Sequence, residues 1–135
     1  MRKERFDAIE TKLVELARQA GAKDVTVGEI IGKFFPRAFV WARRGESKII
    51  KMGEDKAQNV ITFEVIFETM SGASSASYDQ AKTLYYNFYD LLLADVTLGG
   101  LCLRALPIGF ERREFQAEGQ WGHVWVTYVE VLIDI

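Results

Sequence analysis

The sequence predicts an α+β domain, a mixed and mainly antiparallel sheet with two helices packed on one of its faces. Two segments repeat their apolar residues at helical spacing, one at the start of the chain and one at about residues 77–95. The segments between and after them contain runs in which apolar and polar residues alternate, as in half-buried strands. The expected order of elements is α-β-β-β-α-β-β.

The first helix is predicted over residues 2–20. Phe6, Ile9, Leu13 and Leu16 recur at helical spacing with charged residues between them, and Gly21 follows as the residue that ends the helix. We interpret the next stretch, "VTVGEIIGKFF", as a connector with one short helical turn. Pro36 cannot continue a helix, and "RAFVWARR" after it is typical of a strand.

A charged, glycine-containing excursion is expected at about residues 43–58, with a flexible tip. It returns into "VITFEVIFETM", whose apolar residues alternate with threonine and glutamate, which predicts a strand with one buried face. The whole chain, residues 1–135, is expected to form this single domain.

The second helix is predicted to begin at Ser77, because Ser77 and Gln80 have the spacing of a capping box. After "LGGLC" breaks the chain, two strands joined by a turn at "AEGQ" complete the domain. The last of them covers the segment "WGHVWVTYVEVLIDI".

Composition excludes several classes of protein. Hydrophobic residues make up 49% of the 135 residues, so a disordered chain is excluded, and the net charge of −2 gives no overall basic footprint for nucleic acid. The basic start "MRKERFDAIE" has no apolar segment behind it, so we expect no export signal.

Residues for catalysis or metal binding are scarce. The chain has one histidine, His123, and one cysteine, Cys102, too few for a metal site built from these residue types. Cys102 lies among apolar residues, which predicts a buried and unreactive thiol. His123 follows a turn between strands and is expected to be partly exposed at a strand end. We therefore expect no enzyme, no cofactor and no metal.

Apolar residues are in surplus. One set of alternate positions in the last strand can face the core, yet the opposite set includes Val126, Tyr128 and Leu132. The second helix likewise has Tyr86 and Tyr89 beside its main apolar stripe. No further helix is available to cover them, so these five residues are the predicted subunit interface of a homo-oligomer.

One cluster of basic residues is found in the charged excursion. It could be a solvated loop, because Glu46, Glu54 and Asp55 are interspersed, or it could contact an acidic partner. The predicted partner-contact residues are Arg43, Arg44, Lys48 and Lys51.

The order of segments resembles the tail terminator (tail-tube completion) proteins of long-tailed bacteriophages. The likeness is carried by an N-terminal helix leading to "FFPRAFVWA", a charged excursion returning into "ITFEVIFET", a Tyr- and Leu-rich helix, and two closing strands that end in "VTYVEVLIDI". The resemblance implies a ring, hexameric in that family, that sits on the finished tail tube, stops its polymerisation and joins it to the head.

The resemblance also implies partners and a location. The partners would be other copies of the chain, the tail-tube protein and a head-side connector or stopper protein, with DNA only passing through the channel and no membrane. The location would be the tail or neck of the virion, after assembly in the host cytoplasm. Two alternatives stay open: another ring component of the neck or tail, and a small ligand-binding module or enzyme built around His123, Trp121 and Trp125.

Overall fold

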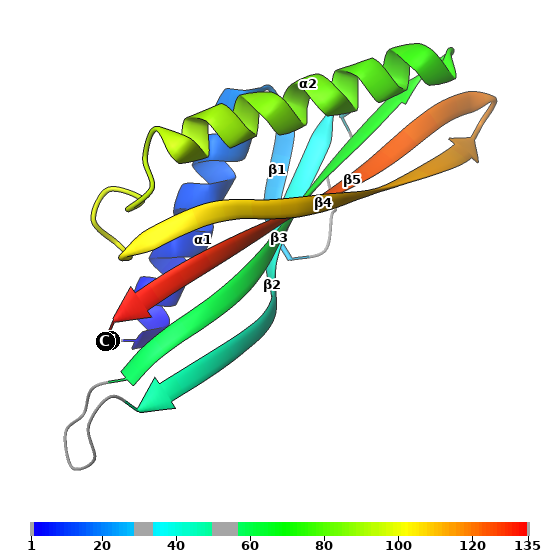
Figure 1. The fold of residues 1–135 in the computed structure, drawn as a ribbon. Helices are drawn as coiled ribbons and strands as arrows, with labels where there is room; N and C mark the ends of the chain where they lie inside the picture. Colours follow the sequence, from blue (N-terminus) through cyan, green and yellow to red (C-terminus); the bar gives the residue numbers. More distant parts are fainter. Residues whose placement is uncertain (1, 29–33, 50–56, 135) are drawn as a thin grey trace.

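The computed structural model describes residues 2–28, 34–49 and 57–134. In these residues the element order is the predicted α-β-β-β-α-β-β, drawn in Figure 1. The bounds are α1 (Arg2–Ala20), β1 (Asp24–Val27), β2 (Arg37–Ile49), β3 (Ala57–Ser71), α2 (Ser74–Leu93), β4 (Arg104–Ala117) and β5 (Gln120–Asp134).

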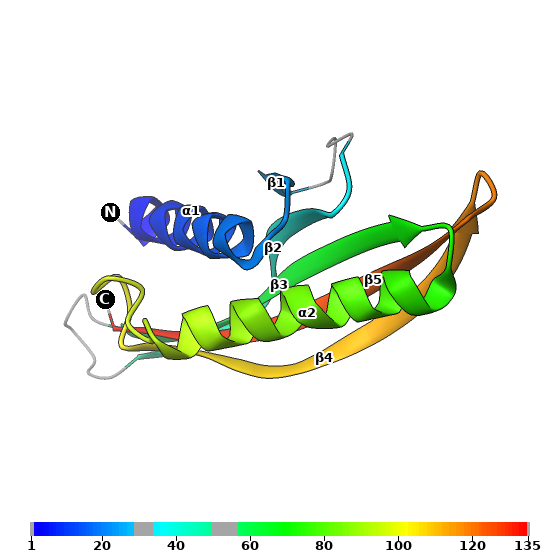
Figure 2. The same ribbon diagram turned by 90° about the horizontal axis from the view of Figure 1, so that it is seen from above.

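The five strands form one sheet in the order β1-β2-β3-β5-β4. The β1–β2 pair is parallel and the other three pairs are antiparallel, so the predicted mixed, mainly antiparallel sheet is confirmed. Figure 2 shows α1 and α2 on the same side of the sheet. Ring contacts agree, because Phe6 of α1 lies 5.3 Å from Phe63 and Phe88 of α2 lies 5.7 Å from Phe67. Phe63 and Phe67 are four residues apart in β3 and so point to one face.

The core lies between this face and the two helices. In β5 the side chains that point to it are fully or almost fully buried, as are the inward positions of both helices. These core residues include Ile9, Leu13, Phe63, Phe67, Leu84, Phe88, Trp125, Val129 and Val131. The alternate positions of β5 that the sequence pattern assigns to the core therefore do face it.

Two details of the sequence interpretation are wrong. Asp24–Val27, expected within a connector, is strand β1 and pairs with the start of β2. Four residues are too few for a periodic pattern to appear, and only Val25 among them is buried. Helix α2 begins at Ser74, and its N-cap residue Ala73 makes no side-chain capping bond. Ser77 is thus inside the helix, where its hydroxyl has another partner.

Most of the charged excursion that the structure describes is strand. β2 continues through Ile49 and β3 begins at Ala57, so the two form a long antiparallel hairpin. The pairing register shifts between Ala42 and Arg44, which places a β-bulge at Arg43. The expected flexible tip, with Lys51, lies outside the described residues.

Candidate functional site

The described residues offer little for catalysis or metal binding. They contain no group of three or more His, Cys, Asp or Glu side chains that could hold a metal ion, and none of their helices is long and apolar enough to cross a membrane. Cys102 is buried, as predicted, and burial raises the pKa of its thiol to about 11. A thiol with that pKa is almost entirely protonated at neutral pH and is a poor nucleophile.

His123 is not partly exposed as expected, because only 1% of its surface is accessible. It lies in β5 directly between Thr69 of β3 and Glu114 of β4. Its Nδ1 atom shares a hydrogen bond of 2.9 Å with the Ser77 hydroxyl, and its Nε2 atom is 3.3 Å from a carboxylate oxygen of Glu114. The sequence did contain a signal for this burial: His123 has the same strand parity as Trp125 and Val129, which face the core.

The arrangement of serine, histidine and glutamate resembles a hydrolytic triad, but Ser77 has no accessible surface. No substrate can reach its hydroxyl, which also lies 3.0 Å from the hydroxyl of Thr69. Ser74 donates a further hydrogen bond of 3.0 Å to Glu114. These hydrogen bonds connect the first turn of α2 to strands β3, β5 and β4. We therefore assign the network a structural role.

Burial lowers the pKa of His123, and the nearby positive charge of Arg112 lowers it further. Glu114 acts in the opposite direction but does not reverse the shift. The network is therefore built around the neutral form of the imidazole.

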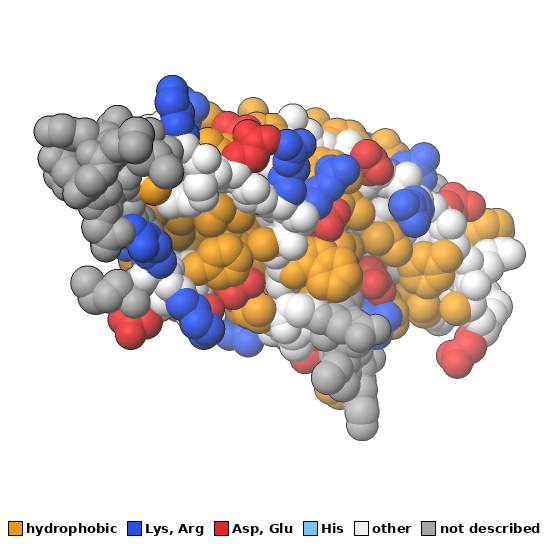
Figure 3. Space-filling model, turned by 90° about the horizontal axis from the view of Figure 1, so that it is seen from below, with side chains coloured by type: hydrophobic (Ala, Val, Ile, Leu, Met, Phe, Trp, Pro, Cys, Tyr) orange, Lys and Arg blue, Asp and Glu red, His pale blue; other side chains and the backbone are white. Residues whose placement is uncertain are grey.

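The larger feature is the face of the sheet that the helices leave uncovered. Across it, Phe39 of β2, Ile66 of β3 and Val126 of β5 form one row, and Trp41, Glu64 and Tyr128 form the next. Figure 3 looks onto this face and shows hydrophobic side chains in several patches, with charged side chains between and around them. An uncovered sheet face usually carries mostly polar residues, so this one is unusually apolar.

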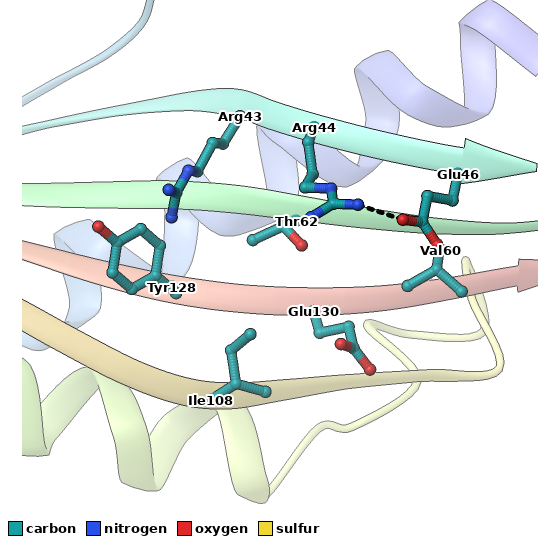
Figure 4. A pocket seen from close by; sticks show the side chains of 8 residues that line it. All are labelled: Arg43, Arg44, Glu46, Val60, Thr62, Ile108, Tyr128 and Glu130. Carbon is teal, nitrogen blue, oxygen red and sulfur yellow. Dashed lines mark hydrogen bonds and ion pairs between the residues drawn. The ribbon is translucent and has the colours of Figure 1, made fainter.

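A shallow hollow of about 400 Å³ lies on this face, and Figure 4 shows the side chains around it. The guanidinium carbon of Arg43 is 4.9 Å from the centre of the Tyr128 ring, while Arg44 forms an ion pair with Glu46. Burial raises the pKa of Tyr128, and the nearby Glu111 raises it further. The full lining is Arg43, Arg44, Glu46, Val60, Thr62, Ile108, Tyr128 and Glu130.

The structure therefore joins two residue sets that the sequence assigned to different surfaces. The expected interface residues Val126, Tyr128 and Leu132 are half-buried on the uncovered face. The expected partner contacts Arg43 and Arg44 lie on the same face, and the exposed Lys48 follows on the same strand. The β2–β3 register that places Arg43 beside Tyr128 includes a bulge, which the sequence pattern does not reveal.

The other two expected interface residues lie on the opposite side of the domain, on α2. Tyr86 is 52% exposed, whereas Tyr89 is half-buried and packs against the core. Both rings contact Tyr85, at centroid distances of 5.0 and 6.0 Å. The domain therefore has apolar residues exposed on two opposite sides.

Sequence reasoning missed two exposed apolar residues in β4. Ile108 is 54% exposed at a bulge between Pro107 and Gly109, and it lines the hollow. Phe110 is 44% exposed and stacks on Trp125 on the helix-covered side, at 4.4 Å between ring centroids. The proline and glycine around Ile108 were the available signal for an irregular strand.

No family model matches the sequence, and no curated protein matches it. Among solved structures, the chain is similar to a chain of a "Virion of native gene transfer agent (GTA) particle", with 15% sequence identity and a TM-score of 0.49. The likeness covers 87% of this chain and 84% of that one. At this identity and TM-score it establishes neither a family nor a function.

Proposed function

We propose that the chain is a structural, non-enzymatic subunit that assembles into a closed ring and acts as a phage tail terminator. The ring would cap the tail tube, stop its polymerisation and mediate head–tail joining. One observation supports self-assembly. The single domain leaves apolar side chains exposed both on the uncovered sheet face and on the outer surface of α2.

Exposed apolar surface on two opposite sides favours a repeating contact. Large exposed apolar patches in soluble proteins usually mark interaction sites. A contact that uses different patches on the two partners leaves one of each free, so it continues until the assembly closes into a ring or grows into a filament. A closed ring is the form that a terminator requires.

The specific role of tail terminator is supported by the segment order noted in the sequence. The helix, the Phe-Pro before a strand, the charged excursion and the two closing strands occur in the same succession as in that family. Exposed Lys48, near the far end of β2, stays a proposed contact for the tail-tube or head-side partner, together with Lys51. Capping the tail tube and contacting these partners require no cofactor and no metal.

The charges of the uncovered face do not suggest DNA as a ligand. Arg43, Arg44 and Arg37 are accompanied there by Glu46, Glu68 and others, and two of the three arginines are paired with a glutamate. A surface that binds the phosphate backbone needs a net excess of free cations. DNA would only pass through the ring.

Analytical ultracentrifugation and negative-stain electron microscopy of the purified chain test the proposal. We expect a closed ring with a central pore and no stacking into tubes. Long tubes would instead indicate a tail-tube subunit, and a monomer at micromolar concentration would contradict the self-assembly. In the phage or prophage that carries the gene, its deletion is expected to give unjoined heads and tails of uncontrolled length.

A further inference from the structure

Several exposed charged side chains have no ion-pair partner among the described residues, and two of them, on opposite sides of the domain, lie beside exposed apolar residues. Arg43, at the bulge of β2, contacts only the ring of Tyr128. Asp90, on α2, is exposed, and no cation lies within ion-pair distance of its carboxylate in the described part of the chain. On the uncovered face Arg44 pairs with Glu46 and Arg37 pairs with Glu68, so Arg43 is the cation of the hollow that has no carboxylate partner in the described residues.

Asp90 lies in an apolar stripe on the outer surface of α2. Tyr86, Asp90 and Leu93 are spaced i, i+4 and i+7, so they share one side of the helix. The opposite side of the helix, with Leu84 and Phe88, is buried against the sheet. Tyr86 is 52% and Leu93 is 45% exposed, so the stripe presents two large apolar side chains and one carboxylate to solvent.

The hollow on the uncovered sheet face has the complementary chemistry. Arg43 supplies a cation beside the ring of Tyr128, and Ile108 supplies further apolar surface. The carboxylate of Glu130 also lines the hollow, farther along it from Arg43. Helices commonly bind apolar grooves through anchors at i, i+4 and i+7, the spacing of the α2 stripe. A carboxylate on such a helix would satisfy the arginine that lacks a partner.

The free sheet edges are poorly suited to joining subunits. Strand β4 contains Pro107 and a bulge, and its second half includes the charged run Glu-Arg-Arg-Glu at residues 111–114. Beyond Val40, where β1 ends, no described strand pairs with the outer edge of β2, and this part contains the bulge and the exposed Arg43, Arg44 and Lys48. Bulges, prolines and charged side chains are the features that prevent edge-to-edge pairing. Contact through faces is therefore favoured.

We propose that the outer surface of α2 in one copy of the chain seats on the uncovered sheet face of the next copy, with Asp90 facing Arg43. Tyr86 and Leu93 then pack over Ile108 and Tyr128. The contact is heterologous, and every copy supplies a helix to one neighbour and a sheet face to the other. This inference rests on the self-assembly in the proposed function and names the surfaces that make it.

A charge exchange tests the contact. Arg43→Asp and Asp90→Arg are each expected to weaken association at least tenfold in sedimentation-velocity titrations. The double variant, in which the two charges are exchanged, should associate within about threefold of the wild type. Glu15→Arg, a change at another exposed acidic residue on α1 away from the contact, is the control: it removes only the ion pair with Lys12 and should assemble normally. All these positions are exposed, and circular dichroism checks that each variant is folded.

A second pair of variants tests the apolar part of the same contact. Tyr86→Arg should weaken association at least tenfold, whereas Tyr86→Phe should assemble like the wild type because the ring is kept. Wild-type assembly by both Asp90→Arg and Tyr86→Arg would overturn the α2 contact and leave the ring proposal standing. Failure of the double variant to recover would also overturn the pairing of Asp90 with Arg43. A monomeric wild type would overturn this contact and the proposed self-assembly together.

Discussion

Mild acid is expected to destabilise the fold through His123. The side chain is almost fully buried, and its pKa in the folded chain is lower than the ordinary value of 6.5. Well above pH 6.5 the imidazole is neutral in both the folded and the unfolded chain, so it adds no pH dependence there. As the pH falls below 6.5 the unfolded chain takes up the proton first, and the free energy of unfolding decreases until the pH reaches the pKa of the folded state.

The size of the effect follows from the uptake of one proton. A single group can change the free energy of unfolding by at most about 1.4 kcal/mol per pH unit. A His123 that stays neutral in the folded chain would therefore reduce stability by up to about 1.4 kcal/mol between pH 7.5 and 5.5. Burial and Arg112 oppose protonation and Glu114 favours it, so the size of the loss will report the balance of these three effects.

Urea unfolding at pH 7.5, 6.5 and 5.5 measures this loss at a fixed protein concentration. His123 is the only histidine in the chain, so His123→Gln removes every histidine titration and replaces no carboxylate residue. The variant should be less stable at pH 7.5 and should lose less stability than the wild type on acidification. Equal losses in the two proteins would refute the reasoning.

Four further substitutions and one labelling reaction test the account of the fold. Ser77→Ala leaves a nitrogen of the buried His123 without its partner and should reduce the free energy of unfolding by about 1–3 kcal/mol in urea titrations, whereas Ser75→Ala on the exposed side of α2 should change it little. Gly122→Ala would place a Cβ atom 2.1 Å from the Phe115 ring, so it should reduce stability by about 1–3 kcal/mol, and Phe115→Ala in the same chain should recover most of that loss. Cys102 should react with iodoacetamide at pH 8 only after unfolding, since burial raises its pKa to about 11; rapid labelling of the native chain would contradict the buried site.

The fold class could be predicted because long elements repeat their pattern many times. Nineteen residues of α1 and fifteen of β5 give the helical and alternating periods enough repeats to be recognised. Strand β1, with four residues, does not, and its position depends on its parallel pairing with β2. The start of α2 was misplaced because Ser77 and Gln80 fit a capping pattern locally, whereas the hydroxyl of Ser77 is held by Thr69 and His123.

The candidate surface could be predicted only in part. Alternation along β5 was sufficient to find Val126 and Tyr128 on a second face. Placing Arg43 beside Tyr128 needs the pairing of β2 with β3 and of β3 with β5, together with the bulge at Arg43. Such contacts depend on register between segments that are far apart in sequence, and one inserted residue changes which face a side chain occupies.

The mass of the purified chain in solution tests the central claim, self-assembly through two opposite surfaces, most directly. Each chain has a mass of 15.4 kDa, and sedimentation velocity at micromolar concentration and moderate salt distinguishes one chain from several. The account predicts one closed species whose mass is a small integer multiple of 15.4 kDa, and its conversion to smaller species by Tyr86→Arg. A wild-type chain that sediments only as a 15.4 kDa monomer would contradict it.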